Sequence, residues 1–202
     1  MNRTRKVFLA IAACVVILFA TACGKDSAPF THGTWSDGRT YTSEFFGFKL
    51  PLNITWIPIS DANLAKTAGI RDMSESSMKT HLDEGGTIHE LIVMTSPSRS
   101  IIITVRDNKK NSSMSEKEFF DAGLTEIKGQ YISSGYTCLG DKSSVIFLGK
   151  STDCVKYSTT KDGKTMHYIT VPVFKNNYTA CIEFGSPDEA DPAKMAAMAA
   201  AV

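Results

Sequence analysis

The sequence lacks a strong excess of charge of either sign, and it lacks the short motifs that mark common catalytic sites. Of its 202 residues, 22 are Lys or Arg and 21 are Asp or Glu, which gives a formal net charge of +1. So weak a field gives no reason to expect a nucleic acid or another polyanion as partner. The chain also has no Gly-x-Ser-x-Gly elbow, phosphate-binding loop or dinucleotide fingerprint. We therefore expect no enzymatic activity and no cofactor.

Histidines are few and widely separated, which argues against a metal site. The four of them, His32, His81, His89 and His167, show none of the spacings that zinc ligands adopt. His89 is followed by Glu90, but the second histidine of a zinc-binding helix is missing. We expect structural or solvated histidines and no bound metal.

Long apolar runs are also absent except for one, which extends from Val7 to Ala20. Three basic residues precede it, and small residues follow it up to Cys23. A positive start, an apolar core and small residues at a cleavage site are typical of a secretory signal. The run is shorter than the roughly 20 apolar residues of a membrane-spanning helix. An ordinary signal peptide cleaved after Ala22, or an uncleaved anchor, are the alternatives.

The Ala22-Cys23 junction resembles the lipobox of bacterial lipoproteins. In that family the cysteine becomes diacylglyceryl-modified and N-terminal, and further acyl chains such as palmitate give stable anchoring. The resemblance implies a signal peptide at 1–22, lipidation of Cys23 and an extracytoplasmic protein held on the cell membrane or the outer membrane. Loss of the signal leaves 19 basic and 21 acidic residues, a formal net charge of −2.

The residues after Cys23 divide into a short polar stretch and one domain. Residues 23–40 are rich in Gly, Ser, Asp and Thr, and they predict a flexible tether that lifts the domain off the bilayer. A single domain is expected over residues 41–202, which is long enough to bury a sizeable core. If Cys23 carries lipid, Cys138, Cys154 and Cys181 remain.

An odd number of cysteines in an oxidising compartment allows at most one internal disulfide. We favour Cys138–Cys154, with Cys154–Cys181 as the rival; three unreacted thiols are an equally open alternative. A hydrolase that pairs Cys154 with His167 is conceivable, but hairpin pairing places Ser158 opposite His167 instead.

Within the domain, the periodicity of apolar residues predicts a mixture of strands and helices. Residues 87–95 and 100–106 are β-branched and apolar on both faces, so we expect them to form the middle of a sheet. Ser115 and Glu118 fit a capping box, which predicts a helix from Glu116 to about Ser133. Asp162-Gly163 predicts a two-residue hairpin turn with Tyr157 opposite Tyr168. Shorter helices are expected at Asp61–Ala68 and from Asp191 onward, whereas 70–84 is ambiguous.

Several segments of the domain together carry a resemblance to a known fold. They are Tyr41-x-x-x-Phe-Phe-Gly-Phe-x-Leu-Pro with Trp56, the helix after Ser115, Phe147 to Lys150, Tyr157, Asp162 to Lys164, and Tyr178 to Phe184. With these segments the domain resembles small bacterial lipoproteins of the PsbP/MOG-like fold. The resemblance implies an α+β fold, namely an α/β/α sandwich with a central antiparallel sheet and helices on both faces. Proteins of this fold bind other proteins, as in photosystem II assembly or recognition of a nuclear-transport GTPase.

These observations favour a lipid-anchored, non-catalytic module that binds an envelope protein or assists its assembly. An exposed aromatic surface near Tyr41 and Trp56 is the candidate binding site. The alternative is a protein that binds a small ligand or an envelope polymer in a pocket between sheet and helices. A hydrolase is the third hypothesis, without a motif to support it.

Overall fold

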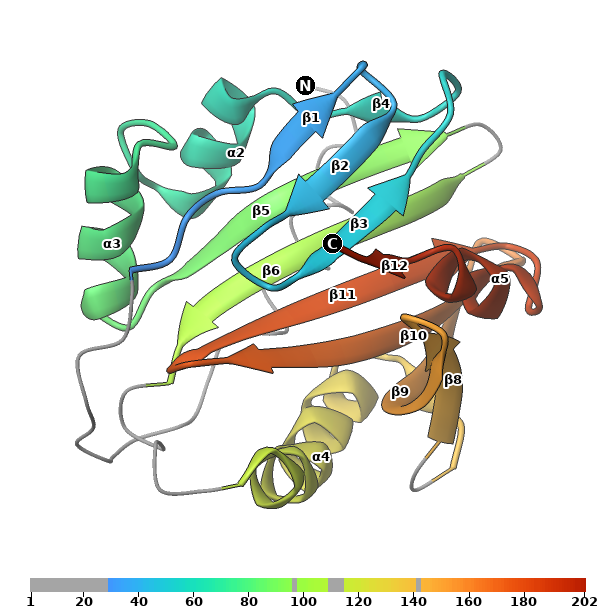
Figure 1. Ribbon diagram of the computed structural model, residues 1–202. Coiled ribbons are helices and arrows are strands. Elements are labelled where there is room, and N and C mark those ends of the chain that lie inside the picture. The colour runs from blue at the N-terminus through green and yellow to red at the C-terminus, as the bar shows by residue number, and fades with distance from the viewer. Residues whose placement is uncertain (1–28, 96–97, 109–114, 141–142) are drawn as a thin grey trace.

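The computed structural model describes residues 29–95, 98–108, 115–140 and 143–202, and these form two antiparallel sheets with helices around them (Figure 1). The helices are α2 (Asp61–Ala68), α3 (Glu75–Asp83), α4 (Glu116–Ser133) and α5 (Asp191–Ala197). The strands are β1 (Thr34–Ser36), β2 (Thr40–Ser43), β3 (Phe48–Pro51), β4 (Ile57–Pro58), β5 (Thr87–Thr95), β6 (Arg99–Asp107), β7 (Thr137–Cys138), β8 (Ser143–Phe147), β9 (Lys150–Lys161), β10 (Lys164–Lys175), β11 (Tyr178–Ser186) and β12 (Ala200–Ala201).

The larger sheet has the strand order β4-β5-β6-β11-β10-β9-β7, and β8 pairs with β9 outside this path. The hairpin predicted over residues 87–106 is present as β5 and β6, but the prediction that it forms the middle of the sheet is wrong. The centre is β11, because this late strand inserts between β6 and β10 and pairs with both. The apolar residues of β5 and β6 indicate that both faces of these strands are buried, but they do not indicate which strand pairs with them.

The hairpin between β9 and β10 confirms the predicted turn. Asp162 and Gly163 have φ values of 51° and 72°, as a type I′ turn requires. The register places Tyr157 opposite Tyr168 and Ser158 opposite His167, as expected from the turn alone. Two residues with the right backbone preference therefore determined the pairing of two twelve-residue strands.

The helices begin and end where their sequence signals place them. At the start of α4 the Glu118 carboxylate accepts hydrogen bonds from the Ser115 N–H (2.9 Å) and hydroxyl (2.7 Å), which confirms the capping box. Helix α2 ends at Gly69 in the left-handed conformation, with φ 73°. The ambiguous stretch forms α3, whose Met78 and Leu82 are buried. Pro192 lies in the first turn of α5.

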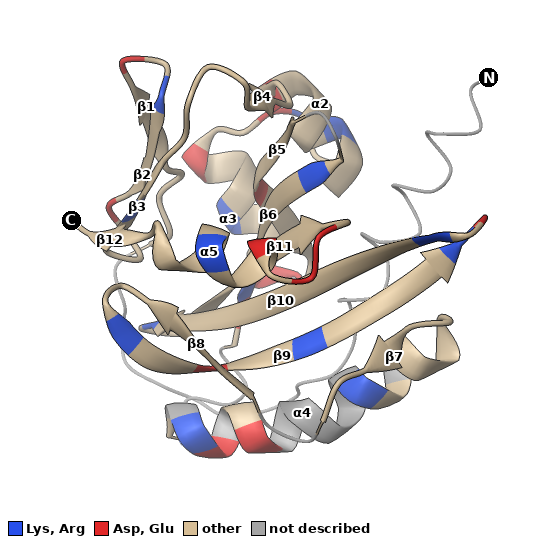
Figure 2. Cartoon of the chain, turned by 90° about the vertical axis from the view of Figure 1, so that its right-hand side faces the viewer, with Lys and Arg blue, Asp and Glu red and all other residues tan. Residues whose placement is uncertain are grey.

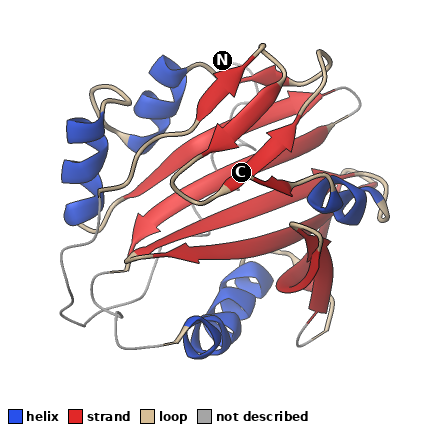
Figure 3. Cartoon of the chain, in the orientation of Figure 1, coloured by secondary structure: helices blue, strands red, loops and turns tan. Residues whose placement is uncertain are grey.

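The smaller sheet, of order β1-β2-β3-β12, packs on one face of the larger sheet (Figure 3). Its Tyr41, Phe48 and Leu50 belong to the same buried cluster as alternate residues of β5, β6 and β11. On the opposite face, Phe120 and Tyr131 of α4 form a second cluster with side chains of β9 and β10. The predicted α+β class is confirmed, with more sheet than the sequence indicated.

The N-terminal part of the domain begins before Tyr41, so the predicted tether boundary is wrong. Phe30 is buried among other aromatic rings, and Trp35 lies in β1, which pairs with β2. A polar composition conceals these contacts, because one aromatic side chain and one strand pairing suffice to order the segment. The remaining part of that stretch, residues 23–28, lies outside the described residues.

Positions of Lys or Arg and positions of Asp or Glu are both spread over the described backbone, among uncharged residues (Figure 2). No element carries a long run of one sign in this view, in agreement with the weak net charge. Among the described residues, no helix is both long enough and apolar enough to cross a membrane.

Candidate functional site

The two aromatic residues expected at a binding surface lie in different environments. Tyr41 is fully buried, so the prediction that it forms part of an exposed surface is wrong. Its hydroxyl donates a hydrogen bond of 2.8 Å to Oε1 of Glu90, which holds the ring in the interior. Trp56 is half-buried and packs against the main core. The period-two apolar pattern around Phe46 to Leu50 marked a core strand, and Tyr41 belongs to the same small sheet.

The cysteines do not form the favoured disulfide, because Cys138, Cys154 and Cys181 are free thiols. Cys138 lies opposite Tyr157 of β9, whereas Cys154 lies three residues before Tyr157 in β9, opposite Ser143. Three residues along a strand separate two positions by about 10 Å and turn their side chains to opposite faces. Burial raises the pKa of the Cys154 thiol to about 11, which keeps it protonated and unreactive. Cys23 lies outside the described residues.

A buried carboxylate that no sequence motif marked connects the two sheets. Glu90 lies at a register shift between His89 and Leu91 in β5, and this bulge turns its side chain toward the smaller sheet. Oε1 accepts hydrogen bonds from the Gly33 N–H (3.1 Å), the Tyr41 hydroxyl (2.8 Å) and the Ser43 hydroxyl (3.1 Å). Glu90 thus connects its own strand, β5, to the N-terminal segment and to β2.

Two opposing effects act on the pKa of the Glu90 carboxyl. Burial raises the pKa of Glu90, and the donors from Tyr41, Ser43 and Gly33 oppose that rise. Burial and the nearby Glu90 carboxyl raise the pKa of Tyr41, which therefore remains a donor. The ring of His32 lies 2.8 Å from the Glu90 backbone oxygen and adds a contact to the same strand.

A second buried carboxylate, Glu183 of β11, lies on the other face of the larger sheet. Four rings surround this position, and we call them the tyrosine cluster: Tyr131, Tyr136, Tyr157 and Tyr168. Tyr157 stacks between Tyr131 (4.1 Å between centroids) and Tyr168 (5.1 Å). Its hydroxyl donates a hydrogen bond to Glu183 Oε2 and lies 3.1 Å from the Thr170 hydroxyl.

Glu183 has less hydrogen-bonding support than Glu90. Its Oε2 atom accepts one hydrogen bond, from Tyr157, and its Oε1 atom, like Oε2 of Glu90, is buried and has no hydrogen-bond partner among the residues that the structure describes. Burial raises the pKa of Glu183 to about 7, and the hydrogen bond from Tyr157 lowers it only in part. Burial and the coulombic effect of Glu183 also raise the pKa of Tyr157. This carboxyl therefore changes its charge near neutral pH, inside an aromatic environment.

Two exposed isoleucines, which the sequence analysis did not single out, lie near Trp56. Ile54 and Ile57 are 75% and 68% exposed, although both flank the half-buried Trp56. The turn before β4 is held by Asn53, whose side chain accepts from the Thr55 N–H at 3.0 Å. Ile57 lies in the edge strand β4 and pairs with Met94 of β5, so Ile57 and the nearby Ile54 lie at an edge of the larger sheet. We call Ile54 and Ile57 the edge isoleucines.

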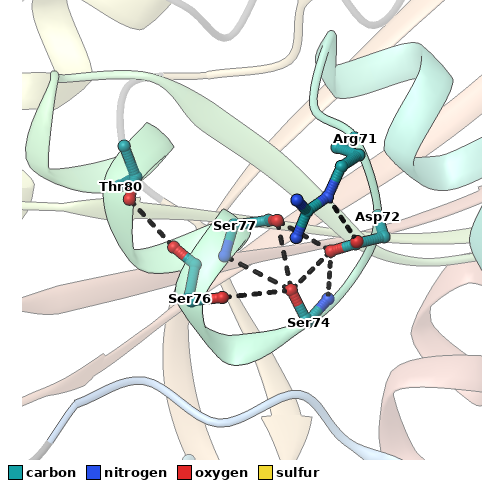
Figure 4. Close-up of polar contacts among 6 residues, drawn as sticks. All are labelled: Arg71, Asp72, Ser74, Ser76, Ser77 and Thr80. Carbon is teal, nitrogen blue, oxygen red and sulfur yellow. Dashed lines mark hydrogen bonds and ion pairs between the residues drawn. The ribbon is translucent and has the colours of Figure 1, made fainter.

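A group of hydroxyls and charges on the surface caps the start of α3 (Figure 4). Asp72 accepts hydrogen bonds from the Ser74 N–H (3.1 Å), the Ser77 hydroxyl (2.7 Å) and Arg71 (2.8 Å). Donors from Ser74, Ser77 and Arg71 hold the pKa of Asp72 well below its usual range. The Ser74 hydroxyl in turn accepts from the Ser77 N–H at the start of the helix.

Three of the four histidines, His32, His81 and His89, contact neighbouring backbone or side chains, whereas Nδ1 of His167 is buried without a hydrogen-bond partner among the described residues. His81 lies 3.3 Å from the Thr87 carbonyl, and His89 lies 3.3 Å from the Thr104 hydroxyl. Burial lowers the pKa of His89, so it is neutral. Within the described ranges, no three His, Cys, Asp or Glu side chains gather in a way that could hold a metal ion.

Sequence reasoning missed Glu90 and Glu183, although each carries a recognisable signal. Each is an acid inside an otherwise apolar strand, in TIHELIVMT and YTACIEFGS. A charged residue in a strand that is apolar on both faces must be buried, and it then requires partners. That signal identifies the position, whereas the partners come from segments 47 to 57 residues away for Glu90 and 26 residues away for Glu183.

No protein-family model matches the chain, and no curated protein matches it by sequence. Among solved structures, it is similar to the cyanobacterial PsbP of Synechocystis sp. PCC 6803, with a TM-score of 0.50 and 10% identity, over 90% of this chain and 98% of that protein. LpqN of Mycobacterium tuberculosis, described as involved in cell envelope biogenesis, matches with a TM-score of 0.38 and 15% identity, over 76% and 82% of the two chains.

A protein of unknown function from Pseudomonas aeruginosa, PA94, described as a putative regulator, matches with a TM-score of 0.32 and 11% identity. This match covers 48% of the present chain and 67% of that one. At 10% identity the likeness to cyanobacterial PsbP is one of architecture, and it confirms a PsbP-like fold of mostly antiparallel sheet with helices. The chain contains a PsbP-like domain.

Proposed function

We propose that this protein is a lipid-anchored, extracytoplasmic and non-catalytic module that binds a protein partner at the cell envelope. The basic, apolar and small-residue segments that end at Cys23 support the anchor. Acylated Cys23 would hold the domain on the cell membrane or the outer membrane.

The observation that carries the binding role is the exposure of the edge isoleucines. Two large apolar side chains that lie largely in solvent, next to a two-residue strand at the sheet edge, are favourable to bury against a partner. An extended segment of the partner can pair with such an edge and cover the apolar side chains, as in β-strand addition. Burying both side chains would contribute about 3–5 kcal/mol of hydrophobic free energy.

Mass spectrometry of the membrane-extracted protein tests the anchor. The N-terminal residue should be an acylated Cys23, and Cys23→Ser should release the protein from the membrane fraction. An unmodified thiol at Cys23 in the wild-type protein contradicts the lipid anchor.

Site-specific photo-crosslinking in intact membranes tests the binding surface. A photoreactive residue at Ile54 should give one discrete adduct that is lost when Ile57→Asp is added. The same residue at Lys161, which is also exposed but lies at the β9–β10 turn, is the matched control. Equal adducts at Ile54 and Lys161, or an adduct that persists with Ile57→Asp, argue against the edge isoleucines as the binding surface.

A second candidate function, binding of a small ligand or an envelope polymer, is favoured by the buried Glu183 Oε1. This oxygen lacks a partner among the described residues and lies beside the tyrosine cluster, where a ligand that donates a hydrogen bond would satisfy it. Native mass spectrometry of the purified lipoprotein should then show a bound mass that Glu183→Gln abolishes. A wild-type protein without any bound mass contradicts this candidate.

We also infer a three-layer α/β/α arrangement with helices on both faces of the larger sheet. Met195 and Ala196 of α5 support it on the face covered by the smaller sheet, and Phe120 and Tyr131 of α4 support it on the other.

A further inference from the structure

The first described residues of the chain are attached to one particular end of the larger sheet. The ring of Phe30 lies 5.4 Å from that of Phe45, 6.0 Å from that of Phe46 and 5.9 Å from that of Tyr178. Tyr178 is the first residue of β11 and follows the turn from β10. We call this end of the domain, which carries Phe30 and the β10–β11 turn, the proximal end.

The residues after Phe30 hold the chain at that position. The His32 ring and the Gly33 N–H bond to Glu90, and β1 then pairs with β2. At Gly33 the buried Tyr41 ring and the Thr42 carbonyl leave no room for a Cβ atom, so the segment lies in direct contact with the sheet. The attachment therefore cannot slide toward the other end of the domain without breaking buried contacts.

The length of chain before this attachment limits its distance from a lipid anchor. Five residues, Gly24 to Ala28, separate Cys23 from Pro29, the first residue described. Even fully extended, this length of chain spans only about 21 Å, at about 3.5 Å per residue. The twelve residues of β10 span about 36 Å from Lys175 at the proximal end to Lys164 at the other end. We call the Lys164 end the distal end.

We propose that the proximal end faces the lipid surface and that the distal end points away from it. This orientation rests on the proposed lipidation of Cys23. An inverted domain, with Lys164 against the bilayer and the proximal end away from it, would require the anchor to span about 36 Å, and the available chain spans about 21 Å. The short connection thus restricts the domain, whereas a flexible tether of the length predicted from the sequence would have left it free to turn.

The orientation also presents the edge isoleucines to a partner in the aqueous compartment. Thr87, the first residue of β5, lies near the proximal end. It pairs with Arg106 of β6, which in turn pairs with Thr179 of β11, beside the β10–β11 turn. Met94, which pairs with Ile57, lies seven residues from Thr87, about 23 Å toward the distal end. The apolar pair therefore lies away from the membrane.

Energy transfer from the domain to the bilayer tests the orientation. Lys164 and Lys175 are a matched pair of labelling positions, because both are exposed lysines at opposite ends of one strand. A fluorescent amino acid is placed at one or the other in the mature lipoprotein, reconstituted in phosphatidylethanolamine and phosphatidylglycerol vesicles with an acceptor on the lipid headgroups. The expected result is strong transfer from position 175 and severalfold weaker transfer from position 164.

Each outcome bears on a separate step of the inference. Equal transfer from the two positions, or stronger transfer from position 164, in vesicle-bound protein overturns the orientation while the anchor stands. Failure of the protein to bind vesicles, with no transfer from either position, removes the anchor and the orientation with it. Circular dichroism of both labelled proteins verifies that each is folded.

Discussion

Glu90 and Glu183 are both buried acids in the interior of apolar strands, yet their surroundings differ in the number of donors. Oε1 of Glu90 accepts three hydrogen bonds, from two separate parts of the N-terminal region. Glu183 accepts one from Tyr157. Burial raises the pKa of both carboxyls, and three donors oppose that rise at Glu90, whereas one donor opposes it at Glu183.

The difference separates a residue that assembles the fold from one that costs the fold stability. Each donor on Glu90 comes from a segment that must be brought to β5, so the carboxylate stabilises that arrangement. Glu183 joins two strands of the same sheet, β11 and β9, across β10, and it leaves Oε1 without a described partner, as Glu90 leaves Oε2. A buried carboxyl near its pKa at neutral pH is more typical of a site that binds or titrates than of a core position.

Replacing Glu90 with alanine should produce the largest effect. The Gly33 N–H and the hydroxyls of Tyr41 and Ser43 would remain buried without their acceptor, and each such donor costs about 1–3 kcal/mol. We expect the free energy of unfolding to fall by about 4 kcal/mol in urea denaturation at pH 7. Glu90→Gln, which keeps one acceptor oxygen, is the control and should lose about half as much. A loss below about 1 kcal/mol for Glu90→Ala would show that these bonds do not stabilise the junction.

Glu183→Gln should change the pH dependence of stability. The folded pKa of about 7 lies above the ordinary value of 4.5, so the protonated carboxyl favours the folded state. That contribution is complete below pH 4.5 and is lost as the pH rises through 7. The wild-type protein should therefore lose about 3 kcal/mol relative to Glu183→Gln between pH 4.5 and 8, since each pKa unit corresponds to about 1.4 kcal/mol.

Urea denaturation of both proteins across this pH range measures the difference directly. Subtracting the curve for Glu183→Gln removes the contribution of every other titrating group. Parallel curves for the two proteins from pH 4.5 to 8 would place the pKa of Glu183 near its ordinary value and erase the contrast with the better-supported Glu90.

Tyr157→Phe should produce the smallest effect; it removes the one donor on Glu183, together with the contacts of that hydroxyl to Tyr131 and Thr170. The variant keeps the ring that stacks between Tyr131 and Tyr168 and removes only the hydroxyl. We expect a loss of about 2 kcal/mol at pH 8.5, where the donor serves a charged carboxylate, and about 1 kcal/mol at pH 5. The midpoint of the Glu183 titration should move upward in the same experiments. A loss that is independent of pH would indicate that Tyr157 acts through packing alone, and Tyr168→Phe provides the matched ring control.

Much of the local structure was predictable because its causes are local. The capping box at Ser115, the hairpin at Asp162-Gly163 and the stop at Gly69 each depend on the backbone preferences of a few adjacent residues. The candidate site was harder to predict from the sequence. Trp56 lies between the edge isoleucines in the sequence, but nothing in the pattern distinguished the buried Tyr41 from a surface residue.

The sequence by itself determined the α+β class, the positions of the main helices and hairpins, and the prediction of an anchor at Cys23, because these depend on periodicity, turn residues and short motifs. Only the tertiary structure decided which strand lies at the centre, that the cysteines remain apart, and which acids are buried with which donors. The bonds to Glu90 join residues 47 to 57 positions apart, and such contacts depend on the path of the whole chain. The placement of Phe30 also depends on distant residues. The polar stretch that contains it belongs to the domain because its ring packs against those of Phe45 and Tyr178.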